Sequence, residues 1–229
     1  MRTKFLIGIG ILGLVTSTLT ASIVGTKHDL GTGYGNDNDE VCVYCHTPHA
    51  SNAEFTGAPL WNKATTTTTF TMYGASAEGV PGQTIAGTAT DATPTGASLA
   101  CLSCHDGVSA MNSVVNAPGS GGYNASGTLI GNDSFNEERM GLSNVRSIGA
   151  YGNLTNDHPI SITYVEGAAS LKPKDTAITG WNNATTINDL LRNGKVQCVS
   201  CHDPHYPRWG TFLRTNNGSS DLCKTCHEK

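Results

Sequence analysis

The cysteine pattern constrains this chain more than any other feature. All eight cysteines of the 229 residues form four C-x-x-C pairs, and a histidine follows each pair directly. The four motifs are Cys42/Cys45/His46, Cys101/Cys104/His105, Cys198/Cys201/His202 and Cys223/Cys226/His227. No cysteine is left over, so one kind of site accounts for every thiol in the chain.

This spacing suits the covalent attachment of haem. Two thiols three positions apart lie on one helical turn, where they can meet the two vinyl groups of a haem and form thioethers. The histidine that follows then lies under the iron as its proximal ligand. Disulfides and zinc are the alternatives for such pairs, but neither explains a histidine at the same offset four times. We therefore expect four covalently bound c-type haems.

Four histidines remain after the proximal ligands, as many as four bis-histidine haems need for their distal positions. They are His28, His49, His158 and His205. Two of them belong to a doubled unit, CVYCHTPH and CVSCHDPH, in which a proline precedes the second histidine. His49 cannot reach round the macrocycle to the iron of His46, because three residues span at most about 10 Å. The doubled unit therefore predicts neighbouring haems held close together for electron transfer.

The sequence also suggests which iron each distal histidine reaches. We expect His49 to bind the haem of the second motif, His205 that of the fourth, and His158 that of the third. His28 lies on a glycine-rich arm, which either folds back to the first haem of its own chain or reaches out to the next subunit. A head-to-tail contact that does not close makes a filament. An ordinary loop histidine is the alternative for each of these residues.

The composition predicts little regular secondary structure. Residues 65–98 and 107–152 are rich in small polar residues and show no helical or strand period. Short helices are expected only at the four motifs and over residues 186–193, where three aliphatic residues share one face. Because such long loops cannot bury an ordinary core, we expect a multihaem cytochrome fold, mostly coil with few short helices, whose core is built from stacked haems.

A short stretch of sequence is repeated in two distant parts of the chain. The stretch WNKATT begins at Trp61, and WNNATT begins at Trp181. Each copy lies in a different half of the sequence. Duplication of a two-motif unit and coincidence both remain open as explanations.

The N-terminus has the layout of a secretory signal peptide. Arg2 and Lys4 precede an apolar run over residues 5–15, and small residues follow. The run is about half of the roughly 20 residues that span a bilayer, so a membrane anchor is the weaker alternative. We expect a signal peptide over residues 1–21 and a tetrahaem cytochrome c domain over residues 22–229. The formal charge of −4 argues against a nucleic-acid partner.

These features together resemble a known family, the extracellular tetrahaem cytochromes of the OmcE type that polymerise into nanowires in metal-reducing bacteria. The leader, the four motifs, the two doubled units, the Lys27-His28-Asp29 arm and the polar loops carry the resemblance. It implies bis-histidine haems in a continuous chain of parallel-stacked and T-shaped pairs, with one axial histidine donated across the subunit interface. It also implies an extracellular or cell-surface location and electron export to metal oxides or partner cells.

On this resemblance we expect a head-to-tail homopolymer in which His28 is the donated ligand. A discrete soluble tetrahaem carrier in the periplasm is the main alternative, because it needs the same ligands. A multihaem reductase acting on a small substrate such as nitrite needs an open iron position, which the full set of distal histidines argues against. A redox sensor is a further alternative, for which the sequence has no additional domain. Two nitrogen ligands predict low haem potentials, because methionine ligation raises them.

Overall fold

The computed structural model describes residues 23–30, 40–73, 90–111, 113–117, 128–129, 148 and 150–228. The signal peptide predicted for residues 1–21 lies outside these ranges, as do the middle of the 65–98 tract and most of residues 118–147. Among the helices of the described residues, none has the length and apolar character that crossing a membrane requires.

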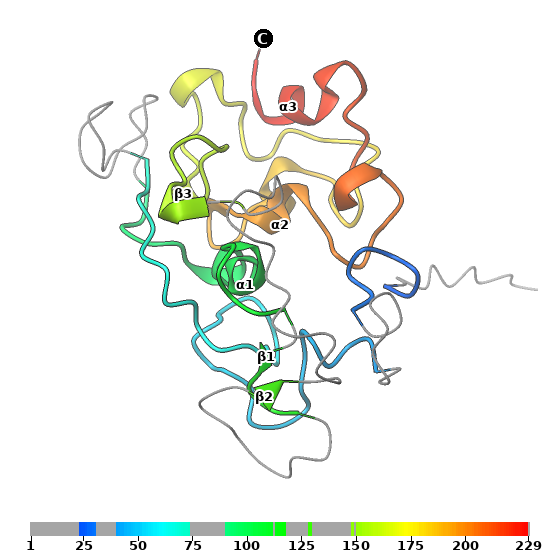
Figure 1. Cartoon of the computed structure of the whole chain (residues 1–229). Coiled ribbons are helices and arrows are strands. Elements are labelled where there is room, and N and C mark those ends of the chain that lie inside the picture. The colour runs from blue at the N-terminus through cyan, green and yellow to red at the C-terminus, as the bar shows by residue number, and fades with distance from the viewer. Residues whose placement is uncertain are drawn as a thin grey trace, which may run out of the picture.

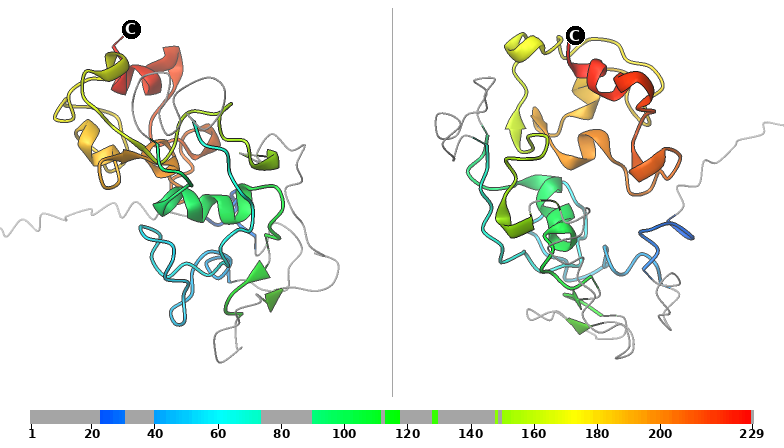
Figure 2. Two further views of the ribbon diagram at one scale, coloured as in Figure 1. Left: turned by 90° about the vertical axis from the view of Figure 1, so that its left-hand side faces the viewer. Right: turned by 45° about the horizontal axis from the view of Figure 1, so that its top comes forward.

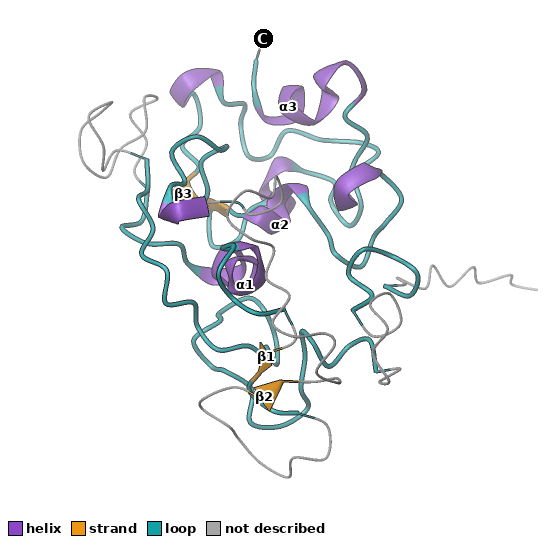
Figure 3. Ribbon diagram, viewed as in Figure 1, coloured by secondary structure: helices purple, strands orange, loops and turns teal. Residues whose placement is uncertain are grey.

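Within the described ranges the chain consists mostly of turns and loops that join very short elements (Figures 1 and 3). The α-helices are α1 (Gly96–His105), α2 (Cys198–Cys201) and α3 (Asp221–Cys226). The 3-10 helices are η2 (Ala150–Gly152), η3 (Ala168–Ser170), η4 (Ile187–Leu190), η5 (Gly210–Phe212) and η6 (Gly218–Ser220). Strands β1 (Ser113–Val114) and β2 (Thr128–Leu129) pair antiparallel, as do β3 (Ile162–Thr163) and β4 (Lys195–Val196). The prediction of a mostly coiled chain with few short helices is confirmed.

The helix expected over residues 186–193 is present in a shorter and tighter form. It is the 3-10 helix η4, whose Ile187 and Leu190 are buried. The Asp189 carboxylate accepts hydrogen bonds from the backbone N–H groups of Thr185 and Thr186, both at 2.9 Å, and so closes the start of the helix. A four-residue helix suits 3-10 geometry, in which each backbone hydrogen bond joins residues only three positions apart.

Three small apolar clusters take the place of one large core in the described residues. The first contains Tyr44 and packs against Cys45, the second contains Leu102, and the third packs against Cys226. Tyr44 and Leu102 are themselves the variable residues between two motif cysteines. Each cluster therefore supports a motif from one side. A core of stacked haems stays a prediction.

Two parts of the chain lie on either side of the contact between α1 and α2 (Figures 1 and 2). We define them as the N-terminal module, residues 40–117 with the first two motifs, and the C-terminal module, residues 160–228 with the other two. Several polar contacts join them, including the following two. The backbone N–H of Cys198 donates to Ser98 Oγ at 2.9 Å, and Lys195 Nζ lies 2.5 Å from Asp91 Oδ1. The modules therefore meet beside the second and third motifs.

Candidate functional site

Each motif forms one helical turn, as the sequence predicts. The second motif ends α1, and the third and fourth lie on α2 and α3. In the first motif the backbone N–H of His46 donates to the Cys42 carbonyl at 2.8 Å, which closes the same turn without a full helix. None of the eight cysteines, all of which lie in the described ranges, forms a disulfide. One turn brings both thiols of a motif to the same side of the backbone, as attachment to one haem requires.

The imidazoles of the first and third motifs are held in one orientation by backbone carbonyls. His46 Nδ1 lies 2.8 Å from the Pro59 carbonyl oxygen, and His202 Nδ1 lies 2.8 Å from that of Thr211. A carbonyl oxygen only accepts hydrogen bonds, so Nδ1 carries the proton and donates it. The Nε2 lone pair is then left for a metal ion. Sequence reasoning did not identify Pro59 or Thr211, because a carbonyl acceptor leaves no side-chain signature.

Six of the eight histidines lie in three pairs of facing rings. The ring centres are 6.2 Å apart for His46 and His205, 6.1 Å for His28 and His105, and 6.4 Å for His158 and His227. Two imidazole nitrogens bound to one metal ion at about 2 Å each place their ring centres roughly 6 Å apart. The three pairs therefore have the spacing of two axial ligands on one iron.

This donor set fits haem better than a bare metal ion. Among the described residues, no three histidine, cysteine, aspartate or glutamate side chains converge to hold a metal ion. A haem iron takes only its two axial ligands from the protein, because the porphyrin supplies the rest. One proximal and one distal histidine in each pair, with two thiols beside the proximal one, match that requirement.

The pairing differs from the one expected from sequence spacing. His205 lies against His46 of the first motif, where we expected it at the fourth. His158 lies against His227 of the fourth motif, where we expected it at the third. The physical reason is that Pro204 keeps the backbone extended after the third motif, which carries His205 away from that motif. The packing of the two modules then decides which motif His205 meets.

His28 folds back into its own chain, to the second motif and not to the first. Its ring stacks on Phe212 at 4.4 Å, and its Nδ1 atom is buried without a hydrogen-bond partner among the described residues. Burial, together with the nearby His105 and His205, lowers the pKa of His28 to about 4, and a hydrogen bond with the Pro204 backbone opposes this shift. The ring is therefore neutral at pH 7, which is the form that binds a metal ion.

His49 and His202 are the two histidines without a facing histidine ring, although all eight lie in the described ranges. The backbone carbonyl of His49 accepts hydrogen bonds from Thr47 Oγ1 at 3.0 Å and from Asn116 Nδ2 at 3.1 Å. Its backbone is thus anchored while the residue stays exposed. The second motif, whose haem we expected His49 to bind, lies beside His28 instead.

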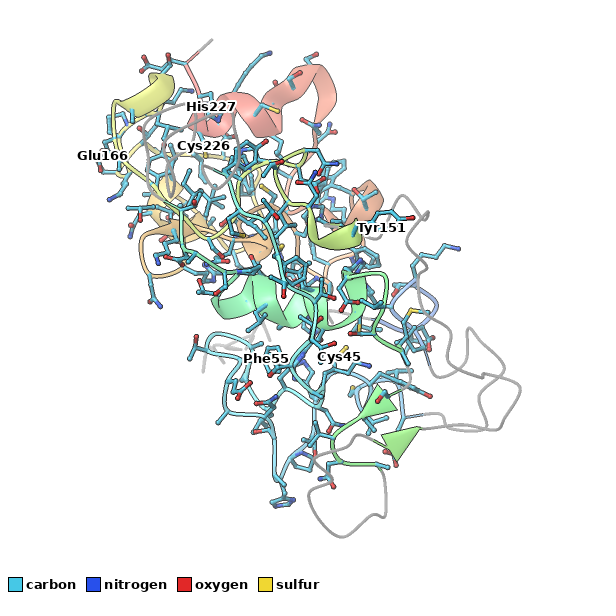
Figure 4. The ribbon with its side chains drawn as sticks, turned by 60° about the vertical axis from the view of Figure 1, so that its left-hand side comes forward. Cys45, Phe55, Tyr151, Glu166, Cys226 and His227 are labelled. Atoms are coloured by element: carbon cyan, nitrogen blue, oxygen red, sulfur yellow. The ribbon has the colours of Figure 1, made fainter. Side chains whose placement is uncertain are left out.

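Cysteines of consecutive motifs are electrostatic neighbours. Burial raises the pKa of the Cys45 thiol to about 12, and Cys104 of the second motif adds to that effect. Burial likewise raises the pKa of Cys201 to about 12, with Cys226 of the fourth motif adding to it. Figure 4 shows Cys45 below α1, and Cys226 with His227 beside α3.

The second and third motifs are joined across the two modules. The thiols of Cys101 and Cys198 form a hydrogen bond with each other, which raises the pKa of Cys101 and lowers that of Cys198. Together with the two contacts inside the modules, this contact places each motif beside the next one along the chain. Consecutive motifs therefore have neighbouring thiols, and the contact between His205 and His46 also brings the unit of the third motif to the first.

Two tryptophans tie the motifs of each module together. Trp61 Nε1 donates to Ser103 Oγ of the second motif at 3.1 Å, and Trp181 Nε1 donates to Thr225 Oγ1 of the fourth at 3.2 Å. Both acceptors stand directly before the second cysteine of their motif. The repeated WN stretch was the sequence signal for this role. Trp61 lies between the two motifs of its module and Trp181 lies before both motifs of its module, so the two tryptophans reach the same acceptor position from different places in the chain.

Comparison with known families matches one part of the chain. A family model described as the doubled CXXCH motif covers residues 191–229, which contain the third and fourth motifs. No curated protein matches the chain significantly. Doubled motifs of this kind imply covalently bound c-type haem, and proteins that carry them are typically exported.

Proposed function

We propose, from the premise that the doubled motif indicates a multihaem c-type cytochrome, that this chain transfers electrons through four closely packed bis-histidine haems. Each haem, when bound, takes up and releases one electron at its iron. We further propose that the chain acts as a subunit of a polymeric extracellular filament for long-range electron export. It is then an electron-transfer protein and not an enzyme.

The contacts between consecutive motifs support a continuous path within one chain. The attachment residues of the first and second motifs are neighbours inside the N-terminal module. Those of the second and third motifs are in contact across the modules, and those of the third and fourth are neighbours inside the C-terminal module. The rate of electron transfer between two haems depends on the distance between them, which these contacts determine. The thioether donors are the eight motif cysteines, and the proximal ligands are His46, His105, His202 and His227.

The observation that carries the filament proposal is the pair of histidines left without a facing ring. His28, His158 and His205 supply distal ligands within the chain, so only the haem of the third motif lacks one. The only distal histidine left is His49, which is exposed at the first motif. We therefore assign the donated ligand to His49 in place of His28. A contact from one motif to a different motif of the next copy is heterologous and can propagate without closing.

Electron microscopy of the purified haem-containing extracellular fraction tests this function. We expect filaments in which every chain carries four thioether-linked haems, as counted by mass spectrometry and haem absorbance. A single-chain particle with four low-spin haems would instead establish the discrete periplasmic carrier, because one chain would then complete all four ligand sets.

A pair of matched variants separates the role of His49 from simple ligand loss. Both His49→Ala and His28→Ala remove one distal ligand, and both should convert about one haem in four to a high-spin spectrum. Only His49→Ala should abolish filaments, because His28 faces His105 within its own chain. Loss of filaments in both variants would show that polymerisation needs complete ligation in general and not the donation of His49.

A further inference from the structure

The two doubled motifs are followed by the same backbone arrangement. In the N-terminal module Thr47 N donates to the Leu60 carbonyl and Asn62 N to the Cys45 carbonyl, at 2.9 and 2.8 Å. In the C-terminal module Asp203 N donates to the Phe212 carbonyl and Arg214 N to the Cys201 carbonyl, both at 2.9 Å. Leu60 and Phe212 also share a left-handed backbone, with φ of 56° and 58°. The two segments are therefore structural repeats, in which Leu60 corresponds to Phe212 and His49 to His205.

The C-terminal module uses this repeat to dock on the N-terminal module. Three of its contacts at the boundary involve the motifs and the histidines that face them. They are the rings of His205 and His46 at 6.2 Å, the ring of Phe212 on that of His28 at 4.4 Å, and the thiols of Cys198 and Cys101. Each contact joins the first motif unit of the C-terminal module to the N-terminal module or to the arm that precedes that module.

The residues that would make the same contacts between two copies of the chain are exposed. In the repeat, His46 corresponds to His202. His28 corresponds to His158 because each precedes a module and faces the second motif of that module. Leu60, with 51% of its surface exposed, stands where Phe212 contacts His28. Leu60, His158 and His202 are exposed in the chain, as is His49.

The cysteines give a second, independent indication. Cys42 and Cys223 are the two cysteines classed as exposed, while the other six are at least partly covered. Cys42 corresponds to Cys198, and Cys223 to Cys101, which contact each other at the module boundary. The first and fourth motifs therefore expose the two cysteines that correspond to the pair already in contact between the second and third motifs.

We propose that the interface between copies reproduces the interface between the two modules of one chain, an inference that rests on the proposed filament. A donor face, Cys42, His49 and Leu60, meets an acceptor face, Cys223, His202 and His158, of a second copy. His49 takes the place of His205, Leu60 covers His158 as Phe212 covers His28, and Cys42 meets Cys223. The fourth motif of one copy then lies beside the first motif of the next, as the second lies beside the third.

Leu60→Asp tests the apolar part of this interface without touching any haem ligand. Aspartate tolerates the left-handed backbone at this position, so the turn is retained. We expect four haems per chain and loss of filaments, with about one haem in four high-spin until imidazole is added. Val108→Asp is the matched control, because Val108 is exposed by 40% but lies on neither face. It should polymerise like the wild type.

Mixing with His49→Ala subunits tests the polarity of the contact. Such a subunit keeps its acceptor face but cannot donate, so it should add to one end of a filament and stop growth there. At one variant in ten, the mean length should fall to about ten subunits for a heterologous contact. Filaments of unchanged length, or full polymerisation of Leu60→Asp, would overturn the repeat interface. Absence of wild-type filaments would overturn the proposed function itself.

Discussion

Replacing Lys63 by methionine should strongly destabilise the N-terminal module. The side chain is only 2% exposed, and its Nζ donates to three backbone carbonyls, of Ala110 at 2.9 Å, Met111 at 2.6 Å and Ser113 at 2.7 Å. Lys63 thereby holds the segment after the second motif against the segment after the first. Methionine has a similar shape, so the change removes the donors without making a large cavity.

The magnitude follows from the acceptors left behind. A buried acceptor that loses its partner costs about 1–3 kcal/mol. Taking the lower value for three carbonyls gives a loss of about 3 kcal/mol in the free energy of unfolding, which is large for a single substitution. Hydration of the carbonyls reduces the loss, and the ammonium group no longer needs to be desolvated.

Guanidinium unfolding followed by circular dichroism, at a fixed protein concentration, measures this change. Lys172→Met is the matched control, because Lys172 Nζ donates to one carbonyl, that of Lys224, in an exposed setting. We expect an effect within about 0.5 kcal/mol there. A loss below about 1 kcal/mol for Lys63→Met would refute the reasoning, since the buried carbonyls would then have found other partners.

Three further predictions follow from the described contacts. Trp61→Phe should cost about 1 kcal/mol and Ser103→Ala about 2 kcal/mol, because Ser103 Oγ also donates to the Ala100 carbonyl, and the double variant should cost about the same as Ser103→Ala alone; additive losses would contradict this. His205→Met should raise the potential of one haem in a redox titration, because methionine opposite His46 favours the reduced iron; unchanged potentials would argue against the ring pairing. Backbone hydrogen bonds from Thr185 and Thr186 lower the pKa of Asp189 to about 2, so its stabilising effect is present above its unfolded pKa of about 3.9 and is lost as the pH falls through about 2. Melting temperatures of Asp189→Asn should therefore fall less than those of the wild type between about pH 4 and pH 2.

The secondary structure and the attachment chemistry were readable from the sequence because both are local. A C-x-x-C-H motif needs only one helical turn, and each of the four motifs forms one. The polar, glycine-rich loops likewise predicted a chain of short elements without an extensive sheet. The hydrogen bonds that orient His46 and His202 were not readable, because their acceptors are backbone carbonyls whose position depends on how a distant segment returns.

The sequence by itself determined how many C-x-x-C-H motifs the chain has and how many histidines can serve them, because motif spacing and ligand counts do not depend on tertiary contacts. Only the tertiary structure decided which histidine faces which motif. The four distal candidates are chemically alike, and their distances along the chain do not restrict their distances in space. Packing of α2 on α1 brings His205 to His46, and the fold of the arm brings His28 to His105. That arrangement leaves His49 exposed and without a partner histidine in its own chain.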